Sequence, residues 1–336
     1  MTAPEKVAVR RRVPAQLRQL FNQQEAIVLA VLVALFLTFT MVRPANFATA
    51  GNLQNLARDG AILLILAVAI TYVTVLGMFD LSIGSVLVFS EVCAVKVTGA
   101  LQGSGGPAII AGLVVAIVAG AAWGTINGFL VARLKLSPFI VTLATLGAAL
   151  GAAQLISGGN DLTTIPESLA TFVGVDSIAG IPVLVVIALL VAVIGGIQLA
   201  QSRFGLLTYA IGSNSDAARR TGIHVNRHII AVYIIAGALA GLAGFLDSAR
   251  FGTTTIGGHG NDALAAITAV ALGGASLYGG RGSMLGTVIG VSIPVVLQNG
   301  LVIIGVQSFW YQIVVAAALI ASIYLDSRRR AGQQRA

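Results

Sequence analysis

Long apolar blocks separated by short polar stretches recur along almost the whole chain. Blocks of about twenty residues span the hydrocarbon core of a bilayer as α-helices. The predicted fold class is therefore an all-α polytopic membrane protein, with broken helices near 77–85 and 273–283. The pattern predicts ten spans, at 25–42, 57–77, 81–99, 107–132, 137–157, 181–200, 229–249, 263–278, 284–305 and 309–326.

The polar ends of the chain frame this single membrane domain. We expect a basic cytoplasmic segment at 1–24, a transmembrane domain at 25–326 and a basic cytoplasmic tail at 327–336. The first apolar block lacks a small-residue cleavage site, so we expect an uncleaved first span and not a signal peptide. Between the fifth and sixth spans, 158–180 is the one sizeable external segment, predicted as an ordered loop with at most one short helix.

Lys and Arg fall almost entirely on one side of the predicted topology. Cytoplasmic loops of membrane proteins carry the excess of these residues, so both termini are predicted to be cytoplasmic. The asymmetry also explains the net charge of +8 without nucleic acid. The cytoplasmic set is Lys6, Arg10, Arg11, Arg12, Arg18, Arg133, Lys135, Arg203, Arg219, Arg220, Arg227, Arg281, Arg328, Arg329, Arg330 and Arg335; the outer set is Arg43, Arg58, Lys96 and Arg250.

The longest basic segment between two apolar blocks is 202–228, and its sequence predicts a short helix within it. Ser213, Asn214 and Ser215 are all residue types that cap a helix by accepting a bond from a free backbone N–H. Asp216 follows in the first turn, where the helix dipole favours an acid.

Gly222 and Ile223 mark the far end of this helix. Gly222 stands where a left-handed C′ residue is needed, and Ile223 supplies the usual apolar C″ contact. A helix of about two turns is too short to be stable alone in water. We therefore expect 202–228 to contact another protein; the competing interpretation is a solvated loop between two spans.

The run AIGSNSDAARRTGIHV at 210–225 resembles the cytoplasmic loop of ABC-importer permeases, where a short helix docks into a groove on the ATPase. The wider run 202–245 resembles the ribose-type branch of that family. The resemblance implies a small docking face at Ala217 and Ala218. The full set of implied coupling residues is Gly212, Asn214, Ser215, Asp216, Ala217, Ala218, Arg219, Gly222 and Ile223.

Three further stretches, 75–85, 123–147 and 257–286, resemble the same branch in order and spacing. Two departures stand out. The first stretch has one extra residue before Asp80, and the last has Asn261 and Asp262 where the family places its acid closer to the following apolar run.

Five polar residues at membrane depth are candidates for the translocation path: Asp80, Ser82, Ser85, Glu91 and Asn127. A carboxylate in a bilayer must cap, pair or line water. Asp80 and Ser82 could cap the following helix, and Asn127 could form a hydrogen bond between helices. Glu91 fits either a hydrogen bond to a polyol or a bond to a neighbouring helix. Both the structural and the path interpretations stay open.

Gly237 and Gly241 form a small-xxx-small pair that permits close helix approach, either within the chain or between two copies. His224 and His228 lie four apart in the polar segment, where we expect a solvated pair. Cys93 is the only cysteine, so an intrachain disulfide is excluded.

The chain has no Gly-Lys pair and therefore no P-loop. We expect no enzyme activity, cofactor or metal in the chain itself. The resemblance implies a bacterial plasma-membrane permease, forming a homodimer and importing a monosaccharide or polyol of the ribose, xylose, galactose or inositol kind. It also implies a separate ABC ATPase and an extracytoplasmic sugar-binding protein. The alternative is an ion-coupled secondary transporter, with Asp80, Glu91 and Asp247 as candidate coupling residues.

Overall fold

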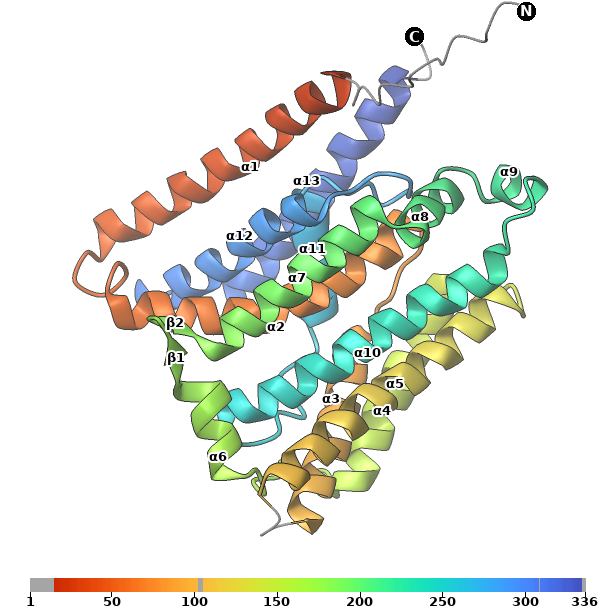
Figure 1. Ribbon diagram of the computed structural model, residues 1–336. Helices are drawn as coiled ribbons and strands as arrows, with labels where there is room; N and C mark the ends of the chain where they lie inside the picture. The colour runs from red at the N-terminus through yellow and green to blue at the C-terminus, as the bar shows by residue number, and fades with distance from the viewer. Residues whose placement is uncertain (1–14, 102–104, 308, 334–336) are drawn as a thin grey trace, which may run out of the picture.

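The computed structural model describes residues 15–101, 105–307 and 309–333 and confirms an all-α membrane architecture (Figure 1). The long helices run roughly along one direction, and the short helices and loops join them at both ends of the bundle. The principal helices are α1 (Ala15–Val42), α2 (Ala50–Val75), α3 (Ile83–Ala100), α4 (Gly106–Ala132), α5 (Pro138–Ser157), α7 (Val183–Gln201), α8 (Arg203–Ser213), α9 (Ser215–Arg220), α10 (Val225–Phe251), α11 (Asp262–Leu272), α12 (Met284–Ile303) and α13 (Phe309–Gln333).

Each predicted span coincides with one of these helices, but one prediction was wrong in length. Seven of the described helices are long and apolar enough to cross a membrane, and three apolar helical stretches are shorter. The span predicted at 263–278 is α11, whose 11 residues give a length of about 16 Å, half of a bilayer core. The chain leaves the helix at Gly273 because the glycine-rich segment after it takes positive-φ conformations at Gly274, Gly279 and Gly280.

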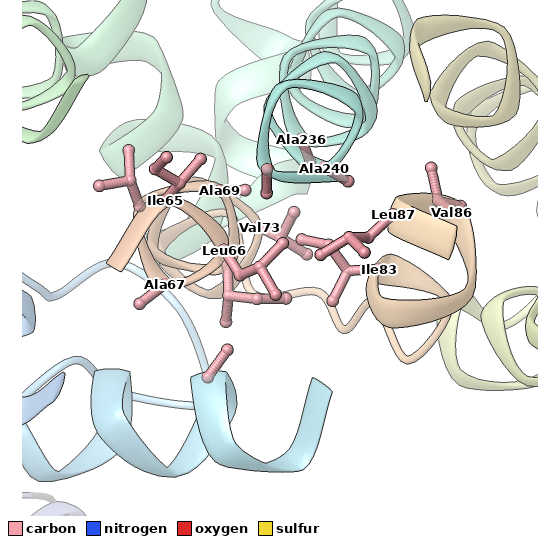
Figure 2. Packing of buried hydrophobic residues seen from close by; sticks show 14 of the residues in the cluster. Ile65, Leu66, Ala67, Ala69, Val73, Ile83, Val86, Leu87, Ala236 and Ala240 are labelled. Carbon is pink, nitrogen blue, oxygen red and sulfur yellow. The ribbon is translucent and has the colours of Figure 1, made fainter. Parts of the chain in front are cut away.

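The core forms where α2, α3 and α10 meet. Leu66 and Val73 of α2 lie against Leu87 of α3, below the small side chains Ala236 and Ala240 of α10 (Figure 2). All five are buried. Alanines on α10 bring its backbone close to the larger aliphatic side chains of the other two helices, so the three helices pack without a gap.

Glycines decide how closely α4 and α10 approach. A Cβ on Gly237 would collide with the carbonyl of Gly120, and a Cβ on Gly241 with the carbonyl of Ala116. These two helices make the most extensive helix–helix contact among the described residues. The sequence did not decide whether Gly237 and Gly241 pack within the chain or between two copies. In the structure they pack within the chain, against α4.

The segment 158–180, which the sequence predicts to be external, contains more secondary structure than predicted. It forms α6 (Glu167–Leu169), a π-helical turn η1 (Ala170–Val175) and a two-stranded antiparallel hairpin of β1 (Ser177–Ile178) and β2 (Ile181–Pro182). Its first part is fastened to the loop after α10, because Leu162 donates to Thr254 Oγ1 at 2.7 Å and accepts from the Thr254 N–H at 2.9 Å.

Candidate coupling loop and buried polar sites

The short helix α9 has the two caps that the sequence predicts. Asn214 is the N-cap: its side-chain oxygen accepts from the Ala217 N–H at 2.9 Å. At the other end Gly222 has φ of 86°. The N–H of Ile223 bonds to the Ala218 carbonyl at 3.2 Å, and that of Gly222 to the Arg219 carbonyl at 3.1 Å. This pair of bonds is a Schellman motif, which needs the left-handed glycine.

The exposed face of α9 differs from the one expected. Ala218 is only 5% exposed and belongs to the hydrophobic core, so its methyl group is not available to a partner. Ala217 is exposed, together with Asp216, Arg219 and Arg220. A partner that docks on α9 would therefore meet a small side chain, Ala217, surrounded by charges of both signs.

The sequence did not predict the helix α8, which precedes α9. Ser202 caps it by accepting from the Gly205 N–H at 3.1 Å. Thr208 on α8 hydrogen-bonds His228 Nε2 at 2.8 Å, and the ring of Phe204 lies 4.4 Å from the imidazole. The prediction of a solvated histidine pair was therefore wrong for His228, which is buried under α8. His224 is exposed, as predicted.

Both breaks in the membrane helices meet at the end of α8. A Cβ on Gly212 would collide with the carbonyl of Val75, the last residue of α2. A Cβ on Gly279 would lie 2.7 Å from both the Gly212 carbonyl and the Gly77 Cα. Glycine is needed at this junction because three backbone segments lie so close together that no side chain fits between them. We call Gly77, Gly212 and Gly279 the glycine junction.

Hydrogen bonds hold the same segments together. The Gly280 N–H donates to the Val75 carbonyl at 2.8 Å. Tyr209 on α8 donates its hydroxyl to the Gly282 carbonyl at 2.7 Å. The polar loop is thus bonded to the segment after α11, and that segment is bonded to the end of α2.

The structure brings three of the five path candidates together. Asp80 Oδ1 accepts from the Ser82 N–H at 2.9 Å and from its hydroxyl at 2.6 Å, and Asn127 donates to the Ser82 hydroxyl at 2.9 Å. All three are buried, and Ser85 is buried one turn further along. Glu91 lies apart from them, in another cluster. Asp80 therefore orders the entry to α3, and Asn127 joins α4 to it.

A cavity of ≈ 730 Å³ opens at the end of the bundle opposite α9. It lies between the first turns of α2, the last turns of α10 and α12, and the start of α13. Its wall holds carboxylates, amides and the ion pair of Arg250 with Asp59 at 3.4 Å. Its polar lining is Asn52, Asn55, Asp59, Asp247, Arg250, Thr255, His259, Asn261, Asp262, Gln298, Asn299, Tyr311 and Gln312.

His259 lies at the inner wall of this cavity between two carboxylates. Its Nδ1 is 2.7 Å from Asp262 Oδ2, and its Nε2 is 3.1 Å from Asp247 Oδ2. Burial disfavours the imidazolium, but the hydrogen bonds and charges of the two carboxylates outweigh burial and raise the pKa of His259 to about 11. Glu91 completes the cluster from α3.

Comparison with known proteins identifies the family. A family model described as branched-chain amino acid transport system / permease component matches residues 52–323. The ribose import permease protein of Escherichia coli (strain K12) is 33% identical over 314 residues, 93% of this chain and 95% of the relative. The chain belongs to the ribose-type ABC sugar permeases.

Other relatives of this permease are named for different sugars. The D-allose transport system permease protein of Escherichia coli (strain K12) is 33% identical over 300 residues, covering 89% of both chains. The fructose import permease protein of Rhizobium meliloti is 32% identical over 317 residues, covering 91% of this chain and 86% of the relative. The permease is thus a multi-pass membrane protein of sugar import, and the relatives do not single out one sugar.

The buried cluster was largely missed from the sequence. Asp247, Thr255 and His259 carry no motif. Glu91 was a path candidate with a bond to a neighbouring helix as the open alternative, and the structure places it in a different cluster from Asp80. The signal available was an acid in the middle of an apolar helix, which implies a partner but does not say which.

Proposed function

We propose that this permease is the membrane subunit of an importer for a neutral monosaccharide or related polyol, driven by ATP hydrolysis in a separate subunit. The relatives are named for the transport of ribose, D-allose and fructose, and these names support the substrate class. The pentose or hexose would be delivered by an extracytoplasmic binding protein.

The observation that carries the coupling proposal is the glycine junction. The ATPase would dock on α9 through Ala217 and its charged neighbours. Movement of α8 and α9 would then act directly on Val75, Gly77 and Gly279, because these residues contact Gly212 without an intervening side chain. Close-packed backbones transmit displacement, since little space remains to absorb it.

The proposed assembly holds two copies of the permease with α9 on the cytoplasmic side. The described ends of α1 and α13 lie at the same end of the bundle as α9 (Figure 1). That end also carries Arg203, Arg219, Arg220 and Arg227, in keeping with the positive charge of cytoplasmic loops. The outer hairpin and the cavity would then face the binding protein.

The test of docking is Ala217→Trp in the permease expressed with its ATPase and binding protein. An indole on the exposed face of α9 should block the groove sterically without disturbing the membrane helices. We expect normal membrane insertion, loss of sugar-stimulated ATP hydrolysis, and at least a tenfold fall in radiolabelled sugar uptake.

The matched control is Ala100→Trp, an exposed alanine at the opposite end of the bundle. It should transport like the wild type. Wild-type uptake by a well-inserted Ala217→Trp permease would overturn docking through α9. Uptake that continues without the ATPase and collapses when the proton or sodium gradient is dissipated would instead establish the secondary-transporter alternative.

A further inference from the structure

Three buried side chains from three parts of the fold bring possible ligand atoms close together. Glu91 of α3, Asp247 of α10 and His259 of the loop before α11 each offer an atom, and these atoms all lie within 4.8 Å of one another. Glu91 is fully buried and Asp247 is 1% exposed. The three residues are 156 and 12 positions apart (247 − 91 and 259 − 247), so only the fold brings them together.

Glu91 is incompletely satisfied in this cluster. Its Oε2 accepts a long 3.4 Å bond from the Thr255 N–H, whereas its Oε1 is buried and has no hydrogen-bond partner. A buried polar atom without a partner costs about 1–3 kcal/mol, and more if it is charged. Its position therefore calls for a ligand, a proton or a cation.

The charges around Glu91 favour a cation. The carboxylates of Asp247 and Asp262 flank His259, so three carboxylates surround a single imidazole. Arg250 in the cavity wall is already paired with Asp59. Buried charges in proteins are paired or coordinate metals, and a bound cation would offset the excess of carboxylates here.

The orientation of His259 matches that of a metal ligand. Its Nδ1 faces Asp262 Oδ2 at 2.7 Å, and its Nε2 is directed towards the Thr255 hydroxyl at 2.6 Å and Asp247 Oδ2 at 3.1 Å. Histidines that bind metals usually donate their other ring N–H to a carboxylate, which holds the ring in place and makes the ligand nitrogen more basic. The 3.1 Å separation of Nε2 and Asp247 Oδ2 suits two atoms bound to one ion at about 2.1 Å each.

We propose that Glu91, Asp247 and His259 bind one divalent transition-metal ion, with Asp262 orienting the histidine. The imidazole nitrogen favours zinc and its neighbours in the series over magnesium and calcium, which prefer oxygen ligands alone. In the metal-free protein Nε2 instead hydrogen-bonds the Thr255 hydroxyl at 2.6 Å, which the ion would have to displace. The ion would join α3 and α10 to the loop before α11 and so form the inner wall of the cavity.

The experiment uses the full chain with Cys93→Ala, without a histidine tag, in lipid nanodiscs. The alanine removes the one thiol that would bind zinc. We expect elemental analysis to find one zinc per chain after equilibration and desalting, and zinc to raise the melting temperature. Cobalt should bind with a visible absorption band, and affinity should fall as pH falls because protons compete for Nε2.

Variants separate this site from adventitious binding. Glu91→Gln and His259→Ala should abolish stoichiometric binding, and Asp262→Asn should weaken it about 10–100-fold. Glu167→Gln, which removes an exposed carboxylate on α6 outside the cluster, should bind like the parent. Absence of metal in the folded parent, or binding unaffected by Glu91→Gln, would overturn the proposal and leave a protonated Glu91 as the explanation.

Discussion

Asp80 illustrates at the scale of one residue how this chain keeps an acid inside the membrane. A carboxylate at the bilayer centre costs about 2.5–3.5 kcal/mol on insertion scales. Here its Oδ1 accepts both the N–H and the hydroxyl of Ser82, and Asn127 donates to the same hydroxyl. The acid thus fixes Ser82, the residue at which α3 begins, and the hydroxyl carries the contact on to α4.

We predict that Asp80→Ala destabilises the permease by about 1–3 kcal/mol, because the Ser82 N–H and hydroxyl lose their acceptor. Asp80→Asn keeps an acceptor oxygen and should remain close to the wild type in stability. Thermal unfolding in detergent measures both. If Asp80→Asn is equally destabilised, the negative charge and not the hydrogen-bond acceptor is what Ser82 requires.

Ser85→Ala serves as the control for this residue-scale experiment, since Ser85 is a buried hydroxyl one turn further along α3 and outside the Asp80 network. We expect it to unfold like the wild type. Sugar uptake by folded Asp80→Asn then addresses the path role directly: near-normal uptake assigns Asp80 to structure, and a large loss assigns it to the path.

At the scale of helices, α4 and α10 depend on glycine at their crossing. We predict that Gly237→Ala destabilises the permease by about 1–3 kcal/mol, because the added methyl group would overpack against the Gly120 carbonyl and force the helices apart. The measurement is thermal unfolding in detergent, with membrane yield as a second readout.

Gly147→Ala on α5 is the matched control, since a Cβ there meets no atom within 4 Å. It should unfold at the wild-type temperature or slightly above, because alanine favours a helix more than glycine does. A Gly237→Ala protein as stable as this control would show that α4 and α10 can separate without cost.

At the scale of the whole molecule, the proposed orientation places the outer hairpin and α9 on opposite sides of the membrane. In a Cys93→Ala background expressed without partners, Ser168→Cys on α6 should react with an impermeant maleimide added outside intact cells. Ser215→Cys on α9 should react only after the membrane is opened. Both positions are exposed. Labelling of both from the same side would contradict the orientation.

Local signals in the sequence determined much of this protein. Ten apolar blocks predicted the helices, because spanning a bilayer requires a long apolar run. Gly222 was predicted as the C-terminal cap of α9, and Asn214 was one of three candidates for its N-cap, because caps act on backbone groups only a few residues away. The breaks after α2 and α11 followed from glycine and polar residues for the same local reason.

Tertiary structure alone decided which of these elements meet. The sequence does not show that α8 covers His228, that Ala218 faces the core, or that α11 is half a span, because each depends on packing against other helices. The junction of Gly77, Gly212 and Gly279 joins segments far apart in the chain. The cluster of Glu91, Asp247 and His259 also joins segments far apart in the chain. These groups interact strongly only because the fold removes them from water and places them close together.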